Sequence, residues 1–348
     1  MIGWYVHHHG SGHEARARTV VPLLDTDVAT FSSRPLDIEG TTSHRLPLDV
    51  EPPATAWHAA QPTPDVLHYA PLGVDGLRRR MGTIASWAAT TDPAAMVVDV
   101  SVEVTLLARL LSIPSVVVRQ HGRRTDPAHR AAHEAASLLL APYPAWLEEP
   151  WVDDDMLART VHCGGFSRFD QRTPDHDRAR ADLGIGADDR VVVVLSGEGG
   201  RMGWPVHDAA AATPGWRWVV LGDVRPRPGL VTPGWVEDPW AWLCAADVIV
   251  THAGHNAVME SVGSGRPVIV IPQDRPFDEQ RHKALLLAEH EVCAVRDTWP
   301  APTSWPALLE GSADTGSPHA QDLVDGKGAL RAADAIDTFV RTTRGGCS

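Results

Sequence analysis

Short apolar runs alternate with helix-like segments along most of the chain. In the first half, runs of mostly aliphatic residues predict buried strands over residues 2–6, 28–31, 96–100, 115–118 and 138–141. Between several of these strands, apolar residues at helical spacing predict helices over residues 15–24, 77–89, 102–111 and 128–137. The second half predicts strands over residues 191–195, 218–221, 248–250 and 268–271. This alternation favours an α/β protein with two doubly wound, mainly parallel sheets.

The boundary between the two halves is expected near residues 165–175, which have the turn and charge content of a linker. We therefore expect one Rossmann-like domain over residues 1–165 and a second over 176–325. The remaining residues, 326–348, are helical by pattern as far as Thr343. The proline-rich polar residues 45–64 predict loops on the first domain.

Composition narrows the classes of partner. The net charge of -13 argues against nucleic acid, which needs a basic face, and gives no support to a polybasic membrane anchor. No apolar run of about eighteen residues exists, and the first residues lack the pattern of a secretory signal. The four cysteines are far apart, so neither a zinc site nor a disulfide framework is indicated. A cytoplasmic protein is expected, with peripheral membrane contact left open.

Residues 248–272, VIVTHAGHNAVMESVGSGRPVIVIP, predict a strand, an anion-holding loop, a helix and a second strand. Gly254 lets the backbone approach a ligand, and the N–H groups of the following helix suit a phosphate. Asn256 and Glu260 are four residues apart, so they share a helical face that can serve a phosphate and a sugar diol together. The alternative is an ordinary strand-helix turn in which Glu260 is only solvated.

The continuation to Gln280 adds a further pattern and a helix from about Glu279 to His290. The composite H-A-G-x-N-x-x-x-E, then G-x-P, then P, then D-x-Q resembles the donor-binding pattern of GT-B glycosyltransferases. The families that it resembles are the family 28 peptidoglycan N-acetylglucosaminyltransferases and the UDP-glycosyl and macrolide glycosyltransferases. The resemblance implies the GT-B fold, with two Rossmann-like domains facing a central cleft and a C-terminal helix that crosses back to the first domain.

The resemblance also implies roles for residues of the second domain. Glu260 would bind the ribose hydroxyls, and the donor sugar would contact Asp278 and Gln280, or Glu279, which intervenes here between two residues that are usually adjacent. The loop and helix start that would hold the diphosphate comprise His252, Ala253, Gly254, His255 and Asn256.

Two other loops of the second domain complete the implied donor site. The turn after the strand at 191–195 resembles the glycine-rich turn of family 28 and contributes Ser196, Gly197, Gly199 and Arg201 as candidates beside the diphosphate. Glu198 departs from the commoner pattern, because a carboxylate repels phosphate. Further on, Trp235 and Val236 stand where relatives hold the nucleotide base, and the indole offers an aromatic face.

The first strand of the chain runs into residues 7–13, HHHGSGH, where Gly12 permits a close approach and His13 begins a helix. Family 28 enzymes carry a glycine-rich, histidine-ended loop here, and many plant-type relatives use such a histidine as catalytic base. An unperturbed histidine titrates near pH 6.5, which suits that task. The alternatives are a metal site for the histidine cluster and a helix-capping histidine.

Two more strand ends carry polar residues. Asp99 could hold an imidazole in one tautomer, or it could cap the helix that begins near Val102. Gln120 and His121 follow the fourth strand, where family 28 relatives place a motif near the acceptor. Gln120 is therefore a candidate acceptor contact, and His121 is the chief rival to His13 as base.

The resemblance implies a metal-independent, inverting glycosyltransferase of class EC 2.4 that moves a hexosyl or N-acetylhexosaminyl group from a UDP- or dTDP-sugar to an acceptor hydroxyl. No cofactor is expected, since the nucleotide sugar is a co-substrate, and the acceptor is a small molecule, a lipid-linked molecule or a glycan. Asp25-Thr26-Asp27 is interpreted as a turn and not as a metal motif. Two alternatives stay open: a UDP-N-acetylglucosamine 2-epimerase-like enzyme, and a non-catalytic GT-B partner protein.

Overall fold

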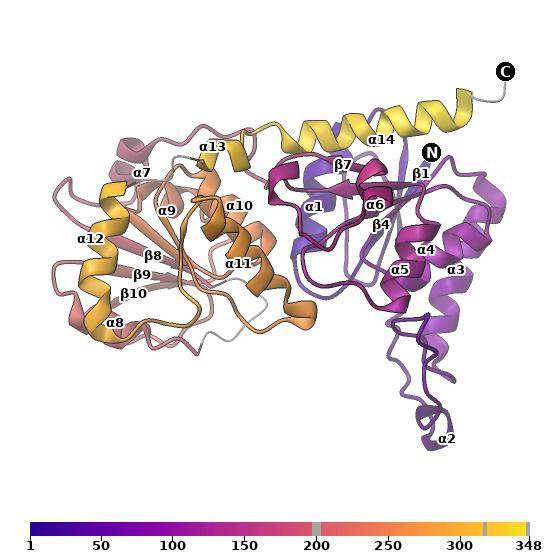
Figure 1. The fold of residues 1–348 in the computed structure, drawn as a ribbon, viewed down its shortest axis with the longest axis horizontal. Coiled ribbons are helices and arrows are strands. Elements are labelled where there is room, and N and C mark those ends of the chain that lie inside the picture. Colours follow the sequence, from indigo (N-terminus) through magenta and orange to yellow (C-terminus); the bar gives the residue numbers. More distant parts are fainter. Residues whose placement is uncertain (197–202, 316–318, 346–348) are drawn as a thin grey trace.

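Two parallel β-sheets, one from each half of the chain, form the framework of the computed structural model (Figure 1). The structure describes residues 1–196, 203–315 and 319–345. The predicted pair of doubly wound sheets is confirmed, since strands β1 to β7 form one sheet and β8 to β13 form the other. None of the helices in these described ranges is long and apolar enough to cross a membrane.

The first sheet has the order β3-β2-β1-β4-β5-β6-β7. Its strands are β1 (Ile2–Val6), β2 (Val28–Ser32), β3 (Thr42–Arg45), β4 (Met96–Asp99), β5 (Ser115–Val118), β6 (Leu138–Ala141) and β7 (Thr160–His162). The five predicted strands are confirmed to within one residue. The edge strands β3 and β7 were not predicted, because β3 is polar and largely exposed and β7 has only three residues.

The second sheet has the order β10-β9-β8-β11-β12-β13. Its strands are β8 (Val191–Leu195), β9 (Arg217–Leu221), β10 (Leu230–Gly234), β11 (Val248–Thr251), β12 (Val268–Val270) and β13 (Ala294–Val295). The central strands are continuous runs of buried Val, Ile and Leu, as expected where helices cover both faces of a parallel sheet. The edge strands β10 and β13 were again missed, because β10 is only half-buried and β13 has only two residues.

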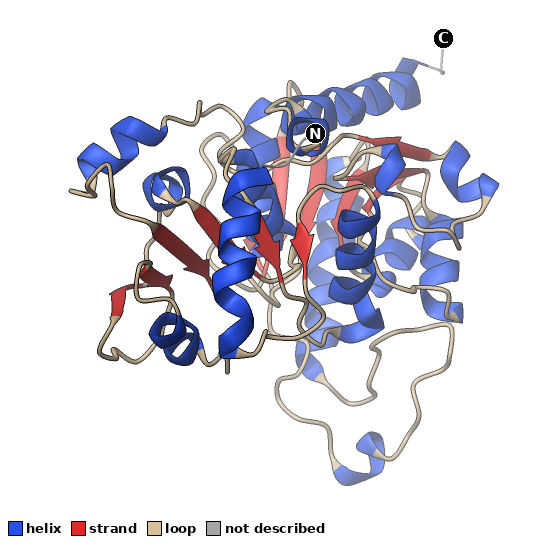
Figure 2. Cartoon of the chain, turned by 60° about the vertical axis from the view of Figure 1, so that its left-hand side comes forward, coloured by secondary structure: helices blue, strands red, loops and turns tan. Residues whose placement is uncertain are grey.

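Helices lie on both faces of each sheet (Figure 2). Those of the first half are α1 (Gly12–Val20), α2 (Ala56–Ala59), α3 (Asp75–Thr91), α4 (Val102–Leu110), α5 (Pro127–Ala135) and α6 (Asp154–Ala158). Those of the second half are α7 (His176–Asp182), α8 (Val206–Ala212), α9 (Trp240–Ala245), α10 (His255–Gly263), α11 (Glu279–Glu289), α12 (Trp305–Thr315), α13 (Ala320–Leu323) and α14 (Gly328–Gly345). Short 3-10 turns are η1 (Val21–Leu23), η2 (Ala145–Leu147), η3 (Pro276–Asp278) and η4 (Pro302–Ser304).

The last helix, α14, packs on the first domain, although it follows the second in sequence (Figure 1). Ala332 and Ile336 share an apolar cluster with Trp4 of β1. Asp337 is buried, and its carboxylate accepts from the Asp25 amide and the Thr26 hydroxyl, each at 2.9 Å. These bonds tie the 25–27 segment, which bends between η1 and β2, to the end of the chain.

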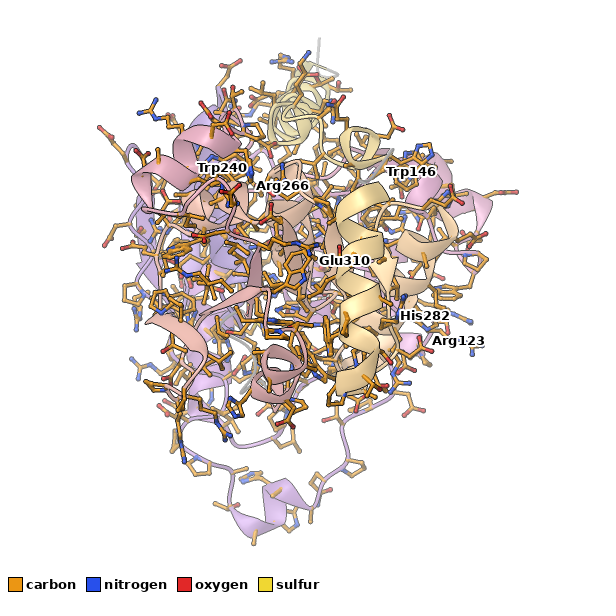
Figure 3. The ribbon with its side chains drawn as sticks, turned by 90° about the vertical axis from the view of Figure 1, so that its left-hand side faces the viewer. Arg123, Trp146, Trp240, Arg266, His282 and Glu310 are labelled. Atoms are coloured by element: carbon orange, nitrogen blue, oxygen red, sulfur yellow. The ribbon has the colours of Figure 1, made fainter. Side chains whose placement is uncertain are left out.

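A second contact between the domains runs along α11. The ring centroids of Trp146 and His290 are 4.9 Å apart, and those of Trp151 and His282 are 4.6 Å apart. Figure 3 shows Trp146, His282 and Arg123 on the same side of α12, opposite Trp240 and Arg266. Beside this contact the Arg123 amide donates to the Phe277 carbonyl at 2.9 Å. The two domains therefore meet through residues that follow β5 and β6, and through α11 from the turn before it to its C-terminal end.

Candidate active site between the domains

A cavity of about 530 Å³ lies between the two sheets, at the carboxyl ends of their strands. Open α/β sheets bind ligands at this edge. One wall comes from the β1–α1 loop and the other from the β11–α10 loop. Predicted site residues that line the cavity are Gly12, His13, Gln120, Trp235, Val236, His252, Gly254, His255, Asn256, Glu260, Glu279 and Gln280.

On the first wall, His13 and Asp99 form a hydrogen-bonded pair. The His13 Nδ1 lies 2.9 Å from Asp99 Oδ1, at the ends of the neighbouring strands β1 and β4. A carboxylate oxygen only accepts, so the proton lies on Nδ1 and the neutral ring has its lone pair on Nε2. Ser101, not Asp99, caps α4 by accepting from the Val104 amide, so the capping alternative for Asp99 is wrong.

Arg16 completes this arrangement from one turn further along α1. Its Nη1 donates to the same Asp99 oxygen at 2.5 Å, and both side chains are buried. Burial raises the pKa of Asp99, but Arg16 and then His13 outweigh it, so that pKa lies below its ordinary value. Asp99 is therefore an ionised group that fixes the orientation of the His13 ring.

The three histidines before Gly10 form a cluster of tilted and edge-on rings beside this pair. Arg80 Nη1 donates to the Tyr5 hydroxyl at 2.6 Å, and that hydroxyl lies 3.4 Å from His7 Nδ1. The chain continues from His7 Nε2 to His9 Nδ1 at 3.1 Å. Within the described parts of the chain, no group of three His, Cys, Asp or Glu side chains is arranged to hold a metal ion.

On the second wall, the N-terminus of α10 opens into the cavity. The first backbone hydrogen bond of the helix runs from the Val258 amide to the Gly254 carbonyl, so the amides of His255, Asn256 and Ala257 precede the helical ladder. A side chain at Gly254 would collide with the His252 ring, so the close turn requires glycine. A helix start of this kind suits an anion, because its backbone N–H groups and the helix dipole both favour negative charge.

His252 has the opposite tautomer from His13. Its Nδ1 accepts from the Gly254 amide at 2.9 Å and lies 3.3 Å from Gln280 Nε2. Burial, with Arg275 and Lys283 nearby, lowers the pKa of His252 to about 4. A neutral ring whose Nδ1 accepts carries its proton on Nε2, which makes His252 a hydrogen-bond donor.

Glu260 lies one turn inside α10 and is buried. It pairs with Arg168, whose Nε lies 2.9 Å from the Glu260 carboxylate, and Arg168 also donates to the Glu237 carbonyl at 2.7 Å. Burial raises the pKa of Glu260, and the Arg168 charge only partly opposes that shift. The alternative interpretation, in which Glu260 is only solvated, is therefore wrong.

Some predicted residues lie away from the cavity wall. His121 is completely buried, and its Nε2 donates to the Leu147 carbonyl at 3.1 Å. Burial and the Lys283 charge lower the pKa of His121 well below its ordinary value, so this ring is a poor rival to His13. Ala253 and Ser196 are buried, and the Ser196 hydroxyl donates to Leu221, whereas Asp278 is exposed. Gly197, Gly199 and Arg201, with Glu198, lie outside the described residues.

Other residues line the cavity without having been predicted. Three arginines are among them: Arg16 and Arg168, whose contacts are described above, and Arg275. Arg16 could have been found from its place three residues after His13, on the same face of α1. Arg168 falls in the stretch interpreted as a linker, so only the folded structure brings it to Glu260.

The sequence is similar to that of glycosyltransferases, both in one family domain and over longer alignments with individual relatives. Residues 241–302 match the glycosyltransferase family 28 C-terminal domain. A UDP-N-acetylglucosamine–N-acetylmuramyl-(pentapeptide) pyrophosphoryl-undecaprenol N-acetylglucosamine transferase from Rubrobacter xylanophilus is 27% identical over 208 residues, or 54% of this chain and 59% of the relative. The Thermus thermophilus enzyme of the same name is 28% identical over 184 residues, or 50% of this chain and 51% of that enzyme. The chain thus spans little more than half the length of these curated relatives.

Solved structures resemble the whole chain. Acinetobacter baumannii MurG superposes with a TM-score of 0.59 at 13% identity and covers 98% of this chain and 99% of its own. Arabidopsis thaliana UGT89C1 complexed with UDP-L-rhamnose gives a TM-score of 0.67 at 16% identity, over 97% of this chain and 98% of its own. The fold is the GT-B fold, and the chain resembles the family 28 and UDP-glycosyltransferases.

Proposed function

We propose that the protein is a glycosyltransferase that moves a sugar from a nucleoside diphosphate sugar to an acceptor hydroxyl. One observation carries this proposal: the cavity between the domains sets an oriented histidine ring against a helix start that suits an anion. A Cβ on Gly12 of the first wall would lie 3.8 Å from Nδ2 of the Asn256 side chain on the second wall. A reacting sugar held between these walls would meet a base on one side and phosphate donors on the other.

The chemistry of the first wall suits deprotonation of the acceptor. The lone pair on His13 Nε2 takes the hydroxyl proton while the acceptor oxygen attacks the anomeric carbon. Asp99 stabilises the imidazolium formed, since its carboxylate already accepts from Nδ1. A single displacement of this kind inverts the configuration at that carbon.

The chemistry of the second wall suits the leaving group. The bond from the anomeric carbon to the phosphate oxygen breaks with its electron pair, and the nucleoside diphosphate leaves. The free amides of α10 and the Nε2–H of His252 supply fixed donors for that charge. On this account the donors do the work that a metal ion does elsewhere, and the reaction is metal-independent.

The rest of the donor is assigned to the remaining residues of the cavity. Glu260 would bind the ribose hydroxyls. It would do so either while keeping its ion pair with Arg168 or after that pair breaks. Trp235 and Val236 would hold the base, and Glu279, Gln280 and the loop of Asp278 would contact the sugar. A UDP- or dTDP-sugar carrying a hexosyl or N-acetylhexosaminyl group fits these roles, in a cytoplasmic enzyme without a cofactor.

A thermal-shift screen of UDP, dTDP and GDP and their sugars tests the proposal. A ligand that binds only the folded state raises the melting temperature by mass action, so the correct donor should stand out. The selected donor is then incubated with EDTA and mixed acceptors, and transfer or hydrolysis is followed by mass spectrometry. Absence of any nucleotide-dependent shift would contradict the proposal. Release of a free 2-epimerised sugar would support the epimerase instead, and loss of activity in EDTA would overturn metal independence.

A further inference from the structure

A second cavity, of about 220 Å³, lies within the first domain beside the cavity between the domains. Much of its wall is apolar and comes from α3, α4, β5 and α5: Leu77, Met81, Val102, Val117, Val118 and Ala132. His9 and Gln120 line both cavities, so the two spaces adjoin at these side chains. The His7 ring, which lines the inner cavity, lies with its centroid 5.9 Å from that of His13.

Each of the two arginines of this inner cavity is paired with a carboxylate, although the buried Nε of Arg124 has no hydrogen-bond partner. Arg80 is buried, donates to Tyr5 and to the Ser33 hydroxyl at 2.6 Å each, and lies 3.3 Å from the Asp49 carboxylate. Arg124 donates to Gln120 at 2.9 Å, and its Nη2 lies 3.2 Å from the Glu279 carboxylate. No lysine is among the described residues that line the cavity.

Three histidines of the wall are buried in a way that favours their neutral form. Burial lowers the pKa of His7 and of His133 to about 3 each, and it also lowers that of His129. Asp49 and Glu103 add carboxylates. An anionic ligand that enters this cavity loses its hydration. Because both arginines of the wall are already paired with a carboxylate, the lost hydration is not fully replaced, and binding of the anion costs free energy.

The outer side of the cavity is covered by the segment between β3 and α3. The amides of His68 and Tyr69 both donate to Glu103 at 2.7 Å, which fastens this segment to the start of α4. Val50, His68 and Tyr69 line the cavity from this side. In Figure 1 the segment hangs below the first domain and carries α2 at its tip. The cavity is thus partly enclosed, and a compact occupant fits it better than a long chain.

We propose that this inner cavity binds the acceptor, and that the acceptor is a compact, uncharged and largely apolar molecule with one hydroxyl directed toward His9 and Gln120. The inference rests on the proposed transferase function and names its acceptor class. A lipid-linked pyrophosphate is excluded as the preferred acceptor by the engaged arginines and by the size of the cavity. The hydroxyl oxygen attacks the anomeric carbon, its proton passes to His13, and the nucleoside diphosphate leaves with the electron pair.

Calorimetry with three probes tests the acceptor class. The first is 2-naphthol, which is uncharged, compact and apolar. The second is 6-hydroxy-2-naphthoate, which keeps the hydroxyl and adds an anion. The third is farnesyl diphosphate, which adds a lipid pyrophosphate. We expect 2-naphthol to bind at least about tenfold more tightly than either anion, since only the anions carry an uncompensated charge into the cavity. Equal or tighter binding of an anionic probe, or no binding of 2-naphthol, would overturn the inference.

Matched tryptophan variants locate the binding site. Met81→Trp should fill the cavity and weaken 2-naphthol binding about tenfold or more. Leu77→Trp fills it from a neighbouring turn of α3 and should do the same. Leu110→Trp adds the same indole at an exposed position of α4 away from the cavity and should leave binding unchanged. An unchanged 2-naphthol affinity in both filled variants would place the ligand elsewhere and end the proposal.

Binding of the selected nucleoside diphosphate, measured on the same samples, separates this inference from the proposed function. Retained nucleotide binding in the filled variants, with 2-naphthol binding lost, supports the inner cavity as acceptor site. If no nucleotide binds the unmodified protein, the transferase function fails whatever the naphthol result. If nucleotide binds and 2-naphthol does not, only the acceptor class fails.

Discussion

His13 and His252 each follow a central strand of their own sheet, His13 at the start of α1 and His252 in the loop before α10, yet their rings present opposite groups. His13 donates through Nδ1 to the Asp99 carboxylate, so its free Nε2 is an acceptor. His252 accepts at Nδ1 from the Gly254 amide, so its Nε2 is a donor. A strand-end histidine thus becomes a base or an electrophilic donor according to the partner of its other nitrogen.

The surroundings of the two rings reinforce this difference. Asp99 places a buried negative charge behind His13 and stabilises the ring when it takes a proton. His252 has positive neighbours, Arg275 and Lys283, which with burial lower its pKa to about 4 and keep the ring neutral. Proton abstraction needs the first environment, and hydrogen bonding to a departing phosphate needs the second.

The most severe way to break the comparison is to remove the proposed base. We expect His13→Ala to lower turnover by about 10²–10⁴-fold, because general base catalysis contributes on that scale. Affinity for the nucleoside diphosphate should stay close to that of the unmodified protein, since the donors of α10 are untouched. Steady-state kinetics and calorimetry on the same preparation check this. Near-normal turnover would remove His13 from the base role and return attention to Asp99 or His121.

Asp99→Asn tests whether the charge behind His13 matters as much as the hydrogen bond. An amide can donate to Nδ1 and so select the wrong tautomer, and it leaves Arg16 without its carboxylate partner. We expect turnover to fall by roughly 10²-fold or more with donor affinity retained. Circular dichroism serves as the control for folding, because a buried arginine loses its partner in this variant.

The pH dependence separates Asp99 from His13. Because the pKa of Asp99 is lowered, its carboxylate stays ionised above the ordinary value of 3.8, and its favourable contribution is lost only as pH falls through the lowered pKa. Any loss of turnover above that value therefore belongs to another group. An acid limb in the pH profile of the unmodified protein that vanishes in Asp99→Asn while turnover stays high would contradict this assignment.

Glu260→Ala should weaken nucleotide binding by about 1.5–3 kcal/mol, the range for hydrogen bonds to a charged group. The pKa of Glu260 is raised, so its ionised form is lost as pH falls through a value above the ordinary 4.5. Nucleotide affinity should therefore decline on mild acidification in the unmodified protein and decline less in Glu260→Gln. Calorimetry with UDP and dTDP across this range checks both. No change in affinity in Glu260→Ala would end the ribose assignment.

The two parallel sheets on which these predictions depend can largely be predicted from the sequence. The apolar runs of β1, β4, β5, β8 and β11 are compatible with few structures other than buried strands. The residues at the ends of those strands follow from the sheets. Short edge strands such as β13 carry too little pattern to be recognised. Partners far apart in the chain could not be predicted either, because Arg168 reaches Glu260 across 92 positions and only folding sets that distance. The same limit explains His121, whose burial depends on Tyr143 and Leu147.

The smallest expected effect concerns His252, and it sharpens the comparison most. If this ring acts only as a donor, His252→Gln keeps an N–H group and should retain most of the affinity for the nucleoside diphosphate. His252→Leu removes that donor at similar size and should weaken the affinity by about 1 kcal/mol, the net value of one hydrogen bond. Calorimetry at neutral pH compares the two variants, with melting temperature as the control for the turn at Gly254. If glutamine is as harmful as leucine, the ring does more than donate one hydrogen bond, and the division of roles between the two histidines fails.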